Sequence, residues 1–64
     1  MILYVTPNRR FAVRYITHNG TYDVVRIETR TAEFAWPVLG NRDYKHDAIG
    51  LAERLDQQEE ADQR

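Results

Sequence analysis

The dipeptide Asn19-Gly20 is the feature that most constrains the fold of this chain, because Asn-Gly is the strongest short signal for a β-hairpin. On either side lie residues 10–18 and residues 21–30, two runs rich in β-branched and aromatic side chains. Such runs are typical of strands that are buried on at least one face. The sequence therefore predicts two antiparallel strands joined by a tight turn at this point.

The length of the turn decides which side chains share a face of the sheet. A two-residue turn would set Val13 opposite Arg26 and would mix apolar with charged groups on both faces, which is poor cross-strand pairing. A three-residue loop, His18 to Gly20, sets Val13 opposite Val25 and needs Gly20 in the left-handed conformation that glycine adopts without strain. We expect the three-residue loop.

A further strand is expected on each side of this hairpin. Upstream, the run that holds Leu3 and Val5 joins the same sheet if residues 7–9 form a comparable three-residue turn, although Arg9 then stands where glycine would be ideal. Downstream, large apolar side chains alternate with Ala35 and Pro37, and proline in a strand indicates an edge. The alternating positions are Phe34, Trp36 and Val38.

After Gly40-Asn41 the apolar period changes from two to about three and a half, which predicts an amphipathic helix. Asn41 or Asp43 is expected to cap its start. Gly50 lies opposite the apolar stripe and is therefore expected to cost about 1 kcal/mol relative to alanine. The stripe is formed by Tyr44, Ala48, Leu51, Ala52 and Leu55.

These elements predict an α+β fold: a three- to four-stranded antiparallel β-meander in the chain order β-β-β-(β)-α, with one C-terminal amphipathic helix packed on one face. Residues 1–55 would form the single domain. Residues 56–64 continue the helical period with acidic residues at the stripe positions. We expect this segment to be an acidic, solvated helical extension or a frayed tail.

Size and composition argue for association and against the common kinds of active site. At 64 residues the chain lies near the lower limit for independent folding, and it has no cysteine for a disulfide or a zinc site. Its two histidines, His18 and His46, fall in a turn and near a helix start, and serine is absent. We predict a protein that is not an enzyme, with no metal, no cofactor and no small-molecule substrate.

The apolar run at the N-terminus, residues 1–5, is too short to span a membrane and lacks the features of a signal peptide. We therefore expect a cytoplasmic protein without a membrane partner.

The expected register leaves one sheet face uncovered by the helix, with tyrosine, aliphatic and arginine side chains together. That composition is enriched at the centres of protein interfaces. The first-choice binding residues on this sheet face are Tyr4, Arg14, Ile16, Tyr22, Val24 and Arg26.

The outer face of the helix is the second choice. Its carboxylates would suit a basic surface of a partner protein, where complementary charge raises the association rate. The residues are Asp47, Glu53, Asp56, Glu59 and Glu60.

Our functional hypothesis is a small non-enzymatic protein-binding module. Its size and surfaces would suit a regulator or inhibitor of a host or defence complex that handles nucleic acid, encoded by a phage or other mobile element and acting by occluding a surface. One alternative is a protein that binds single-stranded nucleic acid, with tyrosines stacking on bases and arginines meeting phosphates. Another is a homodimeric structural or accessory protein.

Overall fold

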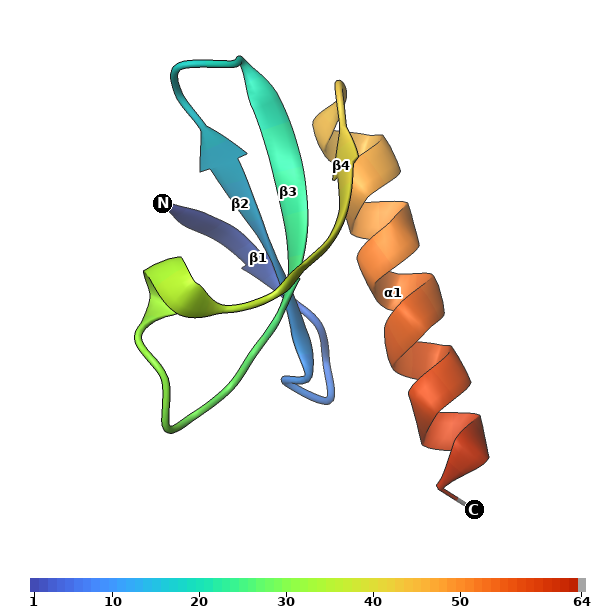
Figure 1. Cartoon of the computed structure of the whole chain (residues 1–64). Coiled ribbons are helices and arrows are strands. Elements are labelled where there is room, and N and C mark those ends of the chain that lie inside the picture. Colours follow the sequence, from blue (N-terminus) through green and yellow to red (C-terminus); the bar gives the residue numbers. More distant parts are fainter. Residues whose placement is uncertain (64) are drawn as a thin grey trace.

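The structure, a computed structural model, describes residues 1–63 and confirms the predicted fold class. Four antiparallel strands form one sheet in the order β1-β2-β3-β4, and the helix α1 follows and packs across β2, β3 and β4 (Figure 1). The elements are β1 (Ile2–Val5), β2 (Phe11–Ile16), β3 (Thr21–Arg26), the short 3-10 helix η1 (Glu33–Ala35), β4 (Val38–Arg42) and α1 (Lys45–Asp62).

The hairpin of β2 and β3 is confirmed, but the expected three-residue loop is wrong. Ile16 pairs with Thr21, so that four residues, 17–20, connect the strands. In this register Val13 lies opposite Val24, and one residue further along β2 Arg14 lies opposite Asp23. An apolar pair thus meets on one face and a pair of opposite charges on the other, and both kinds of cross-strand pair stabilise a sheet.

Two residues have the left-handed backbone conformation that the sequence indicated. Gly20 has φ +67° and closes the four-residue loop. Arg9 has φ +60° in the first hairpin, at the position where glycine would be ideal. That connection is also one residue longer than expected, because the Thr6 amide donates a hydrogen bond to the Phe11 carbonyl (2.9 Å) and leaves residues 7–10 to make the turn.

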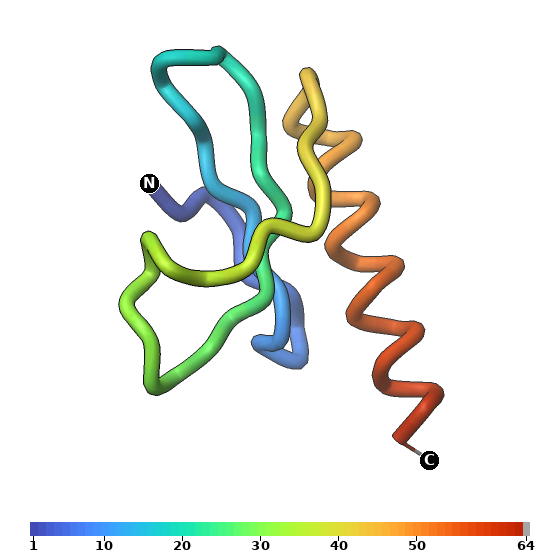
Figure 2. Tube along the Cα trace, in the orientation of Figure 1, coloured from blue at the N-terminus to red at the C-terminus, as the bar shows by residue number. Residues whose placement is uncertain are grey.

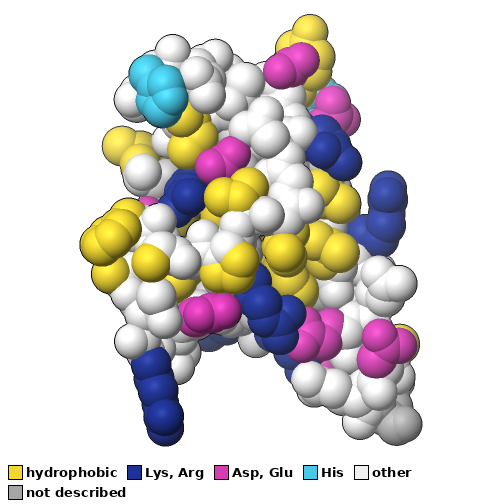
Figure 3. All heavy atoms as spheres, in the orientation of Figure 1, with side chains coloured by type: hydrophobic (Ala, Val, Ile, Leu, Met, Phe, Trp, Pro, Cys, Tyr) yellow, Lys and Arg dark blue, Asp and Glu magenta, His cyan; other side chains and the backbone are white. Residues whose placement is uncertain are grey.

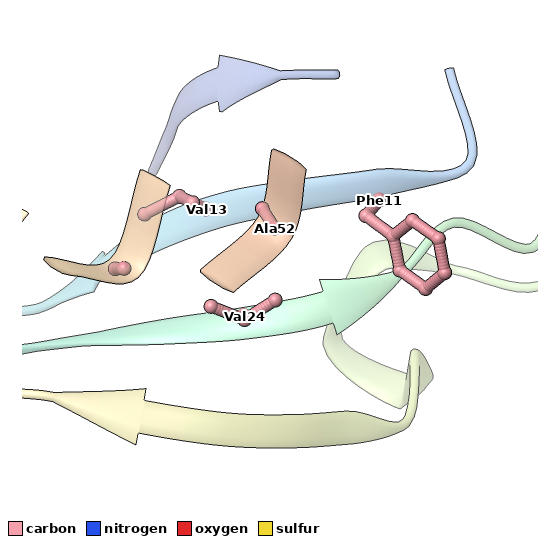
Figure 4. Packing of buried hydrophobic residues seen from close by; sticks show 5 residues of the cluster. Phe11, Val13, Val24 and Ala52 are labelled. Carbon is pink, nitrogen blue, oxygen red and sulfur yellow. The ribbon is translucent and has the colours of Figure 1, made fainter. Parts of the chain in front are cut away.

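The core lies between α1 and the middle of the sheet (Figure 4). Val13 of β2 and Val24 of β3 are fully buried beneath Ala48 and Ala52 of the helix. Burying a valine side chain contributes about 1.5–3 kcal/mol, and the two alanines let the helix lie close to the strands. Phe11 completes the cluster at one end.

The predicted strand around Trp36 is wrong in position, although β4 is an edge of the sheet as Pro37 indicated. The chain instead makes the short helix η1 at Glu33–Ala35, and β4 begins only at Val38. The Trp36 indole donates hydrogen bonds to the carbonyls of Glu28 and Thr31, both 2.9 Å long. These bonds fold residues 28–36 back on themselves, which prevents an extended strand there.

The start of the helix also differs from the prediction. The residue that precedes α1 is Tyr44, which makes no side-chain capping hydrogen bond, so that neither Asn41 nor Asp43 serves as the cap. Asn41 lies within β4 instead. Tyr44 is exposed rather than part of the buried stripe, whereas Leu51 and Leu55 pack against the core as expected.

The segment after residue 55 continues the helix without a break to Asp62. The solvation expected for it is wrong at Asp56, whose exposed fraction is only 2%. Arg64, the last residue of the predicted extension, lies outside the described residues.

Candidate protein-binding surface

The six residues expected on one open sheet face lie on two faces. Arg14 and Ile16 do point away from α1, because they alternate with the core residue Val13. The other four lie on the helix side of the sheet, because each of the two hairpin connections is one residue longer than expected and so shifts β1 and β3 by one residue relative to β2. They are Tyr4, Tyr22, Val24 and Arg26.

The face turned away from the helix is largely covered by the chain itself. Ala12 and Val25 point to that side, yet both are fully buried. The connection between β3 and β4 stands on the side of the sheet opposite α1 (Figure 2). Its contact with the sheet includes a hydrogen bond from the Arg14 guanidinium to the Glu33 carbonyl (3.0 Å). The open tyrosine and arginine face that the sequence suggested is therefore not formed.

The acidic side chains of α1 are mostly engaged by the sheet. The Tyr4 hydroxyl donates a hydrogen bond to Glu53 (2.8 Å). Asp56 accepts hydrogen bonds from the Thr6 hydroxyl (3.1 Å) and from the Asn8 amide (2.8 Å). This buried carboxylate thus joins the helix to the turn between β1 and β2.

The last two turns of the helix are tied down by arginines. Arg26 donates two hydrogen bonds to Glu59, 2.6 and 2.9 Å long, and Arg10 donates one to Glu60 (3.0 Å). Asp47, the remaining member of the predicted acidic set, lies in the first turn of α1 beside the exposed His46. Four of the five carboxylates therefore hold the fold together.

These hydrogen bonds also shift the pKa values of the bonded groups, in the direction that keeps each hydrogen bond formed. The Arg26 guanidinium, chiefly through its hydrogen bond, holds the pKa of Glu59 below its ordinary value, and the same contact raises the pKa of Arg26. The hydrogen bond to Glu53 raises the pKa of the Tyr4 hydroxyl. The ion pair of Arg26 with Glu59 and the hydrogen bond of the neutral Tyr4 hydroxyl to Glu53 both attach the helix to the sheet.

Large apolar side chains are exposed on η1 and at the start of β4. Phe34 is 85% exposed, Val38 is 50% exposed and Leu39 is 46% exposed. We call these three residues the β4 apolar surface. Figure 3 shows hydrophobic side chains over η1 and along the border between β4 and α1, on the side of the molecule that faces the viewer.

A groove of about 460 Å³ opens at that border. Phe11, Leu39 and Leu55 give it apolar walls, and the pair of Arg26 and Glu59 stands beside them. Polar groups from the last turns of α1 complete the lining: Gln58, Asp62 and Gln63. The groove thus combines apolar contact area with charges of both signs.

The loop that carries Phe34 is held by hydrogen bonds among its own residues, and we call it a braced loop. Besides the two indole bonds of Trp36, the amide of Ala35 donates to the Ala32 carbonyl (2.9 Å) and the amide of Trp36 donates to the Glu33 carbonyl (3.1 Å). A compact loop held by its own side chains loses little conformational freedom on binding. This loop was not predicted, because Phe34 and Trp36 have the spacing of a strand; the local signal against a regular strand is Pro37, which cannot donate a backbone hydrogen bond.

Within residues 1–63, no group of three or more His, Cys, Asp or Glu side chains is placed to hold a metal ion. Both histidines are exposed, His18 in the β2–β3 loop and His46 in the first turn of α1. None of the described helices has the length and hydropathy needed to cross a membrane.

Comparison with known proteins gave no match to any family model, to any curated protein or to any solved structure. The function must therefore be argued from the geometry.

Proposed function

We propose that this chain is a small non-enzymatic protein-binding module that docks on its partner through the β4 apolar surface. The observation that carries the proposal is the exposure of Phe34 on a braced loop. Covering a phenylalanine side chain contributes about 1.5–3 kcal/mol, and a rigid aromatic anchor spends little of that on ordering.

The residues around Phe34 also support a role in protein binding. Val38 and Leu39 are half-exposed neighbours in the edge strand β4, with Val38 opposite Val25 on the side away from the helix and Leu39 in the wall of the groove. An aromatic anchor within a larger apolar patch that has a polar rim is the usual anatomy of a protein interface. A module of this kind acts by occupying, and so occluding, a site on its partner.

The arrangement that motivated the nucleic-acid alternative is missing from the described residues. It required Tyr22 and Arg26 on an open sheet face, but both lie on the helix side, and Arg26 is paired with Glu59. Stacking of bases needs exposed rings next to unpaired cations. A protein partner is therefore the better-supported proposal.

The test is affinity capture from the source cell with the tagged chain and two variants. Phe34→Asp removes the anchor, and Val5→Lys is the matched control, because Val5 is a half-exposed apolar residue of the other sheet edge. Far-ultraviolet circular dichroism first establishes that both variants fold. We expect the captured protein to be lost with Phe34→Asp and retained with Val5→Lys. Equal capture by the wild type and Phe34→Asp contradicts the proposal.

A further inference from the structure

The groove has apolar walls and Phe34 is an exposed apolar side chain, so that each would cover the other in a contact between two copies of the chain. The groove lies within the range of about 300–1,000 Å³ that is usual for pockets which bury a ligand, so a benzyl group has room in it. Its apolar walls, Phe11, Leu39 and Leu55, suit an aromatic ring. Phe34 itself, at 85% exposure, contacts little of its own chain.

The positions of the two features favour a symmetric contact. In Figure 1, η1 lies on one side of β4 and α1 lies on the other, and Figure 3 shows apolar side chains over η1 and along the border of β4 and α1, whose residues line the groove. A twofold axis that runs along β4 in front of this face would place η1 of each copy over the groove of the other. Such a contact is isologous and closes after two copies, so it does not build a filament.

The loop and the groove that would meet in this contact both carry charges of both signs. The loop that carries Phe34 has Arg30 and Glu33, one charge of each sign. The groove offers Arg26, which is paired with Glu59, and Asp62. Charges of both signs would therefore face each other across the contact, with no surface of a single sign opposed to its like. Complementary charge of this kind sets the register of an interface more than its strength.

The area that a stable dimer needs is available on this face. A standard interface takes about 800 Å² from each partner, which is roughly a sixth of the 4483 Å² surface of this chain. The chain is 39 Å by 26 Å in its two longer dimensions, so that one broad face can supply this area. A chain of 64 residues without cysteine also has few other means of adding to a small core.

From these observations we propose that the occupant of the groove is a second copy of this chain, in a twofold dimer in which each Phe34 inserts between Leu39 and Leu55 of the other copy. The proposal rests on the proposed function, because it names the partner of the same surface. β4 lies at the centre of the dimer, where Val38 meets its symmetry mate.

Sedimentation equilibrium between about 1 µM and 1 mM tests the dimer. The wild type should show a monomer–dimer equilibrium in this range. Loss of an aromatic anchor costs roughly thirtyfold in Kd. Because a twofold dimer contains the contact twice, Phe34→Ala should raise the Kd about a thousandfold. Val5→Lys, the matched control at the β1 edge, should leave the Kd unchanged.

Mixing two variants tests the reciprocal geometry. Phe34→Asp keeps the groove but lacks the anchor, and Leu39→Asp keeps the anchor but spoils the groove. Each alone should be monomeric, whereas the mixture retains one intact contact. The mixture should form a heterodimer with a Kd roughly thirtyfold above that of the wild-type dimer.

Three results overturn the dimer: a wild type that stays monomeric throughout, a dimer that Phe34→Ala leaves intact, and a dimer that Val5→Lys abolishes. If the wild type is monomeric but Phe34→Asp still loses a captured protein, the proposed function stands and only the second copy as occupant is wrong. If the wild type is monomeric and capture is unchanged, both proposals fail.

Discussion

Replacing Gly50 by alanine should stabilise this protein, and the structure gives the size of the effect. Gly50 lies in the interior of α1, on its exposed side, and a Cβ atom built on it meets nothing within 4 Å. The substitution therefore adds no clash and removes only the entropic cost of glycine in a helix, which is about 0.8–1.0 kcal/mol. For a domain of this size, 1 kcal/mol raises the Tm by roughly 4–8 °C.

Urea unfolding followed by circular dichroism at 222 nm measures the change in the free energy of unfolding. All variants should be compared at one low protein concentration, because association shifts the apparent stability. We expect the midpoint of Gly50→Ala to rise by about 0.5–1 M urea, given the slope of roughly 1–2 kcal/mol/M for small domains.

Substitutions of the other two glycines of the chain serve as internal controls, because they should lower the free energy of unfolding whereas Gly50→Ala should raise it. Gly20→Ala should destabilise by about 1–2 kcal/mol, because an L side chain is strained at φ +67°. Gly40→Val should destabilise by about 1–3 kcal/mol, because a Cβ at this position would lie 2.7 Å from Cδ2 of Leu51 and would force the Leu51 side chain out of its packed position. A Gly50→Ala variant that is less stable than the wild type would refute the placement of this residue on the open side of α1.

Three further changes probe other parts of the structure. Arg9→Gly should stabilise by up to about 1 kcal/mol in urea unfolding, because glycine adopts the φ of +60° without strain; a loss of stability would contradict the left-handed turn. Asp56→Ala should cost about 1–3 kcal/mol, because the buried Thr6 hydroxyl and the partly buried Asn8 amide lose this acceptor, whereas Gln57→Ala, an exposed neighbour, should be within about 0.5 kcal/mol of the wild type. The pKa of Glu59 is lower in the folded state than its ordinary 4.5, so its bond to Arg26 stabilises the fold above pH 4.5 and is lost as the pH falls through the lower folded value. Stability measured from pH 3 to pH 7 should thus fall more steeply on acidification in the wild type than in Glu59→Gln, and parallel curves would exclude this contribution.

The sequence was sufficient for the elements whose signals are local. Asn19-Gly20 specified the hairpin, and the spacing of Ala48 and Ala52 specified which side of the helix is buried. The local sequence could not show which residues of β3 face the helix, because Val24 and Val25 are adjacent and both apolar. Both are fully buried, Val24 under α1 and Val25 on the opposite side of the sheet. Alternation along β3 therefore could not decide which of the two faces the helix, and the loop length followed from the wrong choice.

The candidate site escaped sequence analysis for a different reason. Phe34, Trp36 and Val38 have strand spacing, and only the hydrogen bonds of the Trp36 indole to two carbonyls earlier in the chain convert that spacing into a loop. Hydrogen bonds from one side chain to backbone carbonyls five and eight residues earlier in the chain produce no periodic pattern in the sequence. The exposure of Phe34 is a consequence of that loop, so it could not be read from Phe34 itself.

The acidic helix shows why a run of charge can mislead about function. Asp56, Glu59 and Glu60 lie beyond the apolar stripe, and each meets a donor that comes from the sheet or from the turn between β1 and β2. Reversing these charges would place cations against Arg10 and Arg26, and the end of α1 would leave the sheet. A loss of binding in such variants would then report a displaced helix rather than a docking surface. Since Glu59 also borders the groove, even a true loss of contact there would be confounded with misfolding. Substitutions at Phe34, whose side chain supports nothing in the fold, separate the two effects.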